Sequence, residues 1–185
     1  MKKYIIVFIV VFIGYLVGNS IYTEMSKDKT PGKAKRLACQ KATTTFERGF
    51  GIDEIKVAQN LLIEGNVKFT SSIEKSRYAQ SRLFDFISLS DTDKIFQNAL
   101  DQYIKADGMQ SENPLKISYN IYENDINDPG KKTKKSKLYA GYIVLEVKNE
   151  NNKIIYKVQR DFMDKKGADI AQSIQCCVDS FATYK

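Results

Sequence analysis

The chain has 185 residues, with 29 Lys and Arg against 22 Asp and Glu and a formal net charge of +7. Because it contains no His, it can have neither a Ser-His-Asp or Cys-His catalytic centre nor a His-ligated metal site. A Walker A motif, a G-x-S-x-G motif and a dinucleotide-binding glycine pattern are also missing from the sequence. We therefore expect a protein that is not an enzyme and that uses no cofactor and no metal ion.

An apolar segment near the N-terminus indicates contact with a membrane. Residues 4–22 read YIIVFIVVFIGYLVGNSIY and follow Lys2 and Lys3. The unbroken apolar run ends at Val17, and a helix of that length would span only about 21 Å. Extension to Tyr22 brings the helix close to the roughly 30 Å hydrocarbon core of a bilayer.

This segment has two interpretations. We favour an uncleaved transmembrane anchor over residues 1–22, followed by a linker at 23–32 and an extracytoplasmic domain at 33–185. The protein would then cross the inner (plasma) membrane once, although the basic residues that follow the segment argue for the opposite orientation. The alternative is a signal peptide cleaved near Ser20, which would leave a secreted or periplasmic protein.

The first half of the domain has a mixed pattern. Apolar residues along one side of residues 33–46 predict a helix. Residues 61–64 and 67–70 flank Gly65-Asn66 and fit a hairpin that turns there, whereas residues 53–63 fit a short helix instead. Residues 73–82 are polar and fit a helix or a loop, whereas residues 83–89 are expected to be extended and largely buried.

The clearest helix follows. We expect Ser90 to cap it, with Asp93 at the third helical position. Asp107-Gly108 is expected to end it, because Gly readily adopts the left-handed conformation that follows many helices. A single apolar stripe runs along this helix: Ile95, Phe96, Ala99, Leu100, Tyr103 and Ile104.

Three strands and a helix are predicted for the second half. Residues 115–122 alternate between apolar and polar, residues 138–148 are apolar on both faces, and residues 153–163 form a third strand. A closing helix begins near Gly167, and its apolar stripe consists of Ile170, Ile174, Cys177, Val178 and Phe181. We expect an α+β fold in which an antiparallel sheet of three or more strands is packed by helices, including the C-terminal helix, behind the membrane segment.

A run of lysines is the candidate binding site. Between two predicted strands lie Lys131, Lys132, Lys134, Lys135 and Lys137. The run is either a solvated loop or a contact for an anionic surface such as lipid head groups. Nucleic acid is disfavoured as a partner, because no aromatic residue or Arg lies within the run to stack on bases. The partners we expect are the membrane, through residues 4–22, and a protein or an anionic lipid; the oligomeric state stays open.

The segment Glu123–Gly130 offers several side-chain oxygens at close spacing. Counted from Asp125, however, the position of the final glutamate of an EF-hand loop is occupied by Ser136. We therefore interpret the segment as a turn and not as a calcium site.

Three cysteines occur, at Cys39, Cys176 and Cys177. In an oxidising compartment one disulfide would leave one thiol free. Cys177 lies on the apolar stripe of the C-terminal helix and Cys176 points about 100° away. We therefore predict a Cys39–Cys177 bridge with Cys176 free; the alternative is that all three are small apolar packing residues.

These observations favour a non-enzymatic, membrane-anchored envelope protein whose extracytoplasmic domain binds a protein or an anionic envelope component. The alternative is a secreted or periplasmic hydrolase that uses only carboxylates. A cleft with two facing carboxylates would support the hydrolase, whereas an exposed apolar groove would support binding.

Overall fold

The computed structural model describes residues 36–105 and 113–185. The predicted membrane segment at 4–22, the linker at 23–32 and the cleavage site near Ser20 lie outside the described residues. Within them, no helix combines the length and the apolar character needed to cross a bilayer.

Four α-helices and five strands occur along the described residues. In chain order they are α2 (Ala38–Ala42), β1 (Thr45–Gly49), α3 (Ile52–Ile63), β2 (Val67–Glu74), α4 (Leu89–Asp101), β3 (Leu115–Glu123), β4 (Gly141–Lys148), β5 (Ile154–Phe162) and α5 (Ile170–Ala182). Two short 3₁₀ helices, η1 (Leu83–Asp85) and η2 (Lys135–Lys137), lie in the connections.

The five strands form one mixed sheet in the order β1-β5-β4-β3-β2. The predicted antiparallel meander is confirmed, because β3 pairs with β4 and β4 with β5 in antiparallel register. Two further strands extend it: β1 is antiparallel to β5, and β2 is parallel to β3. The fold is therefore α+β, as expected, with a larger sheet than the three predicted strands.

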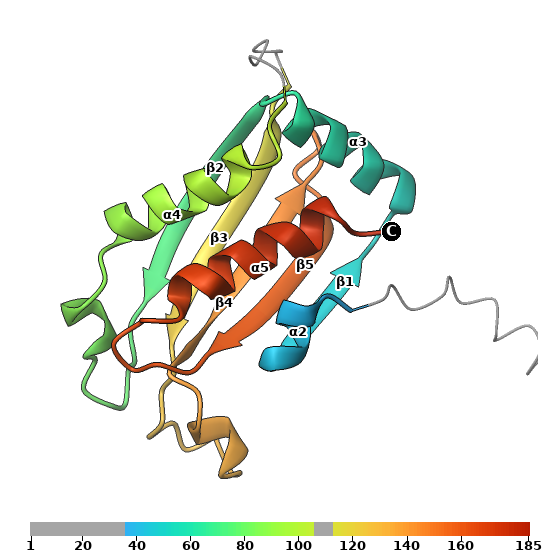
Figure 1. Ribbon diagram of the computed structural model, residues 1–185. Coiled ribbons are helices and arrows are strands. Elements are labelled where there is room, and N and C mark those ends of the chain that lie inside the picture. The colour runs from blue at the N-terminus through green and yellow to red at the C-terminus, as the bar shows by residue number, and fades with distance from the viewer. Residues whose placement is uncertain (1–35, 106–112) are drawn as a thin grey trace, which may run out of the picture. The chain divides into compact units, whose positions relative to one another are not determined.

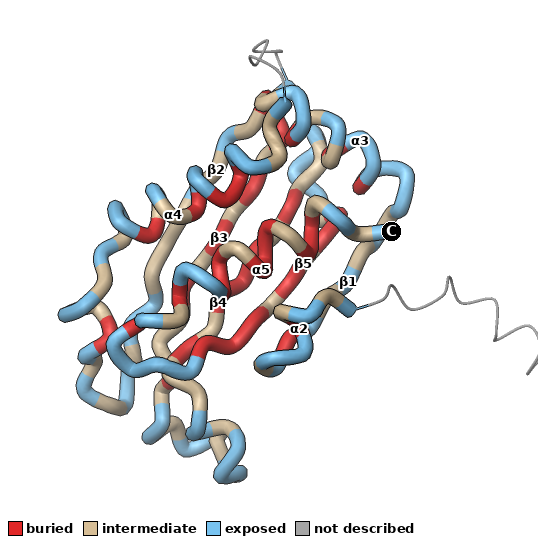
Figure 2. The backbone as a smooth tube through the Cα atoms, in the orientation of Figure 1, coloured by how far each residue is buried: buried red, intermediate tan, exposed pale blue. Residues whose placement is uncertain are grey.

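The helices α3, α4 and α5 lie on the same face of the sheet (Figure 1). The alternation predicted for β3 points toward them, since Leu115, Ile117, Tyr119 and Ile121 are all buried. The predicted stripe of α5 is buried as well, from Ile170 to Phe181. Figure 2 shows this buried layer between the helices and the central strands. Within the described residues, none of these helices covers the opposite face (Figure 1).

The helix expected at residues 33–46 is confirmed only over Ala38–Ala42 and is wrong after Ala42, while residues 33–35 lie outside the described residues. Helix α2 ends at Ala42, and the chain then turns into β1, which pairs with β5 from Thr45 to Gly49. A run of three threonines, Thr43 to Thr45, follows Ala42. Branching at Cβ restricts their side chains in a helix and favours a strand.

The ambiguous segment at residues 53–63 is a helix, α3, and not the first strand of a hairpin. Gly65 adopts a φ of 72°, a left-handed conformation that Gly reaches without strain, and turns the chain into β2. Strand β2 then pairs with β3, so the Gly65-Asn66 turn joins a helix to a strand.

The start of α4 also differs from the prediction. Residues 83–89 do not form an extended segment, because η1 occupies Leu83–Asp85 and α4 already begins at Leu89. Ser88, and not Ser90, caps the helix: its hydroxyl accepts a hydrogen bond from the backbone N–H of Asp91 at 3.1 Å. The predicted end at Asp107-Gly108 lies outside the described residues, and α4 ends earlier, at Asp101.

Candidate binding surface

A single buried side chain organises the loop that carries the lysine run. Asn124 follows β3 and is 5% exposed. Its side-chain amide donates to the backbone carbonyls of Ser136, at 3.2 Å, and Tyr139, at 2.7 Å. Its backbone N–H donates to the carbonyl of Ala140 at 2.8 Å. These bonds close residues 124–140 into a folded loop at one end of the sheet.

The structure divides the five predicted lysines into two groups. Lys131 is half-buried: its ammonium donates to the side-chain oxygen of Asn124 and lies 5.4 Å from the centre of the Tyr139 ring. It therefore belongs to the internal structure of the loop. The other four are exposed and remain available to a partner: Lys132, Lys134, Lys135 and Lys137. We call these four residues the basic loop.

A groove of about 510 Å³ borders the basic loop. Its walls come from the start of β1, the end of β5 and η2. Three large apolar side chains at this groove are unusually exposed: Phe46 at 62%, Leu138 at 65% and Met163 at 47%. Exposed apolar residues that gather around one hollow are typical of binding surfaces. We call this hollow, together with the basic loop, the basic groove.

A buried carboxylate also lines the basic groove. Asp161 is 7% exposed, and its backbone N–H donates to the carbonyl of Thr44 at 3.0 Å. Burial raises the pKa of its carboxyl group above the ordinary value, although hydrogen bonds from Thr44 and Gln159 and the charge of Arg160 oppose the increase. The groove therefore combines a hydrogen-bonding group at its wall with apolar side chains and lysines at its rim.

Tyrosines continue from this groove across the uncovered face of the sheet. The rings of Tyr122 on β3 and Tyr142 on β4 are stacked, with their centres 4.7 Å apart. Tyr139 meets Tyr142 edge to face at 6.4 Å. This aromatic row was not predicted, because its members come from two strands and a loop and become neighbours only through the register of the sheet.

The acidic segment after β3 has a structural role. The Glu123 carboxylate accepts hydrogen bonds from the backbone of residues 76, 82 and 83. The Asp125 carboxylate accepts three more, from residues 77, 78 and 79. Burial alone would raise the pKa of the Glu123 carboxyl, but these hydrogen bonds lower it below its ordinary value. Both carboxylates thus anchor the loop that follows β2, and no cluster of metal-binding side chains is found among residues 36–105 and 113–185.

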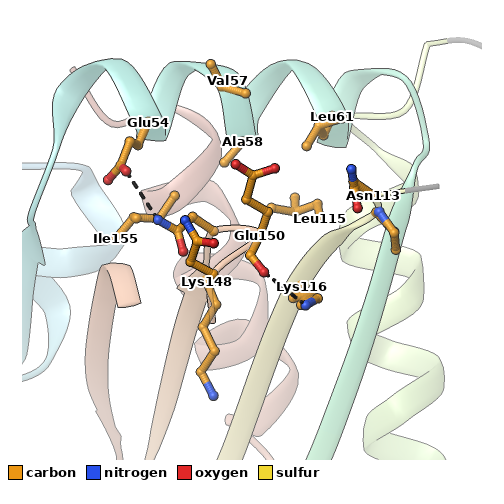
Figure 3. A pocket seen from close by; sticks show the side chains of 13 residues that line it. Glu54, Val57, Ala58, Leu61, Asn113, Leu115, Lys116, Lys148, Glu150 and Ile155 are labelled. Carbon is orange, nitrogen blue, oxygen red and sulfur yellow. Dashed lines mark hydrogen bonds between the residues drawn. The ribbon is translucent and has the colours of Figure 1, made fainter. Parts of the chain in front are cut away.

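A second pocket, of about 400 Å³, lies between α3 and the ends of β3 and β4 (Figure 3). Buried apolar residues, Ala58, Leu115 and Ile155, line it. Two carboxylates are also present: Glu54 from α3 and Glu150 from the turn between β4 and β5. Both side chains are exposed, and the Glu54 carboxylate accepts a hydrogen bond from the side-chain amide of Asn149 at 3.2 Å.

The disulfide joins Cys39 to Cys176, with Cα atoms 5.9 Å apart, and not to Cys177 as we predicted. Cys177 belongs to the core cluster, where burial raises the pKa of its thiol to about 12 and keeps it unreactive. Helix α2 packs against the flank of α5 and does not enter the space between α5 and the sheet. It therefore meets the cysteine that points sideways from α5.

Polar side chains beneath α2 reinforce this attachment. Gln40 is 3% exposed, and its amide donates to Ser180 on α5 at 2.9 Å and to Glu47 on β1 at 3.0 Å. The guanidinium group of Arg160 donates to the backbone carbonyl of Cys39. The N-terminal end of the described chain is thus fixed to both α5 and the sheet.

Comparisons with known proteins identify no family. No protein-family model matches the chain, and no match is found among curated proteins. Among solved structures, a PelC dodecamer from Paraburkholderia phytofirmans is similar at a TM-score of 0.39 with 11% sequence identity, over 73% of this chain and 94% of that chain. This similarity is too distant to support a conclusion about function or assembly.

Proposed function

We propose that this chain is a non-enzymatic envelope protein, anchored in the inner membrane by residues 4–22, whose extracytoplasmic domain binds an anionic envelope component or a protein. The observation that carries the proposal is the basic groove, where exposed apolar side chains lie beside the exposed lysines of the loop at one end of the sheet. Helices protect the other face. The uncovered face is therefore the one that can accept a partner.

The composition of the basic groove favours an anionic partner with apolar parts. Lysines attract negative charge, and Phe46, Leu138 and Met163 supply apolar area that a partner could remove from water. An anionic lipid surface, or an acidic protein segment with an apolar side chain, has this chemistry. Four of the five predicted lysines contribute to it, since the ammonium of Lys131 is already engaged inside the loop.

The second pocket supports a second candidate function, that of a carboxylate-dependent hydrolase. Glu54 and Glu150 line the same pocket, and a glycosidase needs two carboxyl groups that flank its substrate. We rank it lower because a catalytic acid is normally tuned by burial, whereas both of these side chains are exposed.

The first test uses the domain from residue 36 onward with Lys132, Lys134, Lys135 and Lys137 changed to Gln. We expect binding to vesicles that contain phosphatidylglycerol to weaken at least about tenfold, because each lysine near an anionic membrane contributes roughly 1 kcal/mol. Binding of the unchanged domain should fade as salt is raised, since exposed charges are screened. Vesicle sedimentation at several salt concentrations measures both effects.

The control removes the same charge from other surfaces, by changing Lys41, Lys56, Lys105 and Lys153 to Gln. All four of these side chains are exposed and lie outside the basic loop. This variant should bind vesicles almost as well as the unchanged domain. Equal weakening by both variants would mean that only net charge matters, and the assignment of the basic groove to an anionic lipid surface would be wrong.

The second test concerns topology. A reporter that is active only outside the cytoplasm, fused after Lys185 of the full chain, should be active. The exposed C-terminal residue gives the fusion room without disturbing the core. A cytoplasm-only reporter at the same position should be silent. The opposite pattern would show that the basic residues after the apolar segment hold the domain in the cytoplasm.

A further inference from the structure

We infer that two copies of this chain pair through strand β2, edge to edge, so that their sheets join into one. Strand β2 covers Val67–Glu74 and has β3 on one side. No strand within residues 36–105 and 113–185 pairs with its other side. An edge strand presents N–H and C=O groups to any extended chain, and natural proteins usually block such edges.

Strand β2 lacks most of the usual blocking features, and its two charged residues, Lys68 and Glu74, lie near its ends. It pairs with β3 over its full length without a bulge, it contains no Pro, and its central residues, Phe69–Ile73, carry no charge. The other edge strand, β1, is better protected. It is only 5 residues long, and Glu47 and Arg48 lie near its middle. In addition, the guanidinium group of Arg36 donates a hydrogen bond to the backbone carbonyl of Thr45 at 2.9 Å. The longer and uncharged edge is therefore the one suited to pairing.

The ladder with β3 determines which backbone groups of β2 face outward. The N–H of Leu115 donates to the carbonyl of Asn66 at 2.8 Å. In a parallel ladder, alternate residues direct both their N–H and C=O groups to the same neighbour. The even-numbered residues of β2 therefore bond to β3. The groups that point away from the sheet belong to Phe69, Ser71 and Ile73.

These outward groups define one antiparallel register. When Ser71 of one copy faces Ser71 of the second, Phe69 lies opposite Ile73, and all the outward groups form hydrogen-bonded pairs. Both apolar side chains already pack at the margin of the core, on the helix-bearing face. Each would cover the other in the dimer.

The open face is complementary in the same register. Lys68 lies opposite Glu74 of the second copy, and by symmetry Glu74 lies opposite Lys68. Both side chains are exposed in the single chain. A shift of the register by two residues would separate these charges. Charge and apolar pattern thus select the same pairing of two identical strands, which is why a second copy fits this edge better than an unrelated peptide.

This dimer does not depend on the proposed binding function. Strand β1 lies at the opposite edge of the sheet from β2, so pairing leaves both basic grooves open at the outer edges of the joined sheet. Two grooves on one particle would strengthen attachment to a surface that carries many copies of its ligand.

A charge exchange in the full chain tests the interface. Lys68→Glu and Glu74→Lys should each raise the dimer Kd about tenfold, because opposite charges that face each other across strands become like charges. The double variant Lys68→Glu/Glu74→Lys should restore the original Kd. Light scattering over a concentration series, with the full chain in detergent, gives the Kd. A double variant as weak as the single variants, or a chain that is monomeric at every concentration, would overturn the inference.

Cysteine crosslinking tests the register and separates it from any association through the N-terminal segment. Thr70 lies opposite Ser72 of the second copy in a non-hydrogen-bonded pair, where Cα atoms are about 4.5 Å apart and a disulfide can form. Full chains with Thr70→Cys/Ser72→Cys should therefore form dimers on a non-reducing gel after mild oxidation in cells. Either single variant should stay monomeric, because its cysteine faces a hydroxyl. Crosslinking by a single variant, or none by the double variant, would contradict this register.

Discussion

Removal of the disulfide, as Cys39→Ala/Cys176→Ala, should lower the free energy of unfolding by up to about 5 kcal/mol. The bridged residues are 137 positions apart, so the bond restricts nearly the whole unfolded domain, and the entropy that it removes grows with the length of the closed loop. Urea unfolding of the domain folded under oxidising conditions measures the loss. Addition of a reductant should bring the unchanged domain close to the variant.

Cys177→Ala is the matched control, because it removes a buried cysteine from the same helix and leaves the bridge intact. Its stability should still fall on reduction, as in the unchanged domain. Peptide mapping of the oxidised protein should recover Cys39 linked to Cys176. A linkage to Cys177, or a Cys177→Ala variant that no longer responds to the reductant, would contradict the pairing.

Leu100→Ala should destabilise the domain by about 2 to 5 kcal/mol, since it leaves a cavity among packed side chains. Leu100 is 1% exposed and lies in the buried stripe of α4, next to Phe96 and Ala99 of the same core cluster. Phe96 in turn stacks on Tyr119 of β3 with ring centres 4.4 Å apart. Truncation of the Leu100 side chain therefore weakens the packing of α4 against the sheet.

Val57→Ala on α3 is a suitable comparison, because it also shortens an apolar helical side chain. Val57 is 61% exposed, so its truncation should change the free energy of unfolding by less than about 0.5 kcal/mol. Chemical denaturation of both variants distinguishes the sites. A cost under about 1 kcal/mol at Leu100 would show that the α4 stripe contributes little to the core.

Local patterns in the sequence were sufficient for the centre of the fold. The alternation over residues 115–122 and the stripe from Ile170 to Phe181 identify β3 and α5, because each element is amphipathic at its own period. The strands of the meander are also consecutive in the chain. Strands that follow one another in the chain usually pair with each other, even where a loop as long as residues 124–140 joins them, so their order could be read directly.

The edges of the sheet could not be predicted in this way. Strand β1 is short and partly exposed, and only its partner β5 makes it a strand. One of the two interpretations of the sequence had strand β2 turn back on the preceding segment, whereas it pairs in parallel with β3, beyond the intervening helix α4. Such pairings depend on contacts between residues far apart in the chain, which no local period reports.

In the candidate sites, too, some features could be predicted from the sequence and others only from the structure. The lysine run is visible in the sequence because its residues are adjacent, and the charges near both ends of β2 are visible too. The basic groove brings Phe46, Leu138 and Met163 together from three separate segments, and the choice of Cys176 over Cys177 depends on which side of α5 the helix α2 meets. By itself, the sequence determined which residues carry charge and which short segments are amphipathic. Only the tertiary structure decided which of them become neighbours, because the packing of helices on one face of the sheet and hydrogen bonds between distant residues set the positions of these segments.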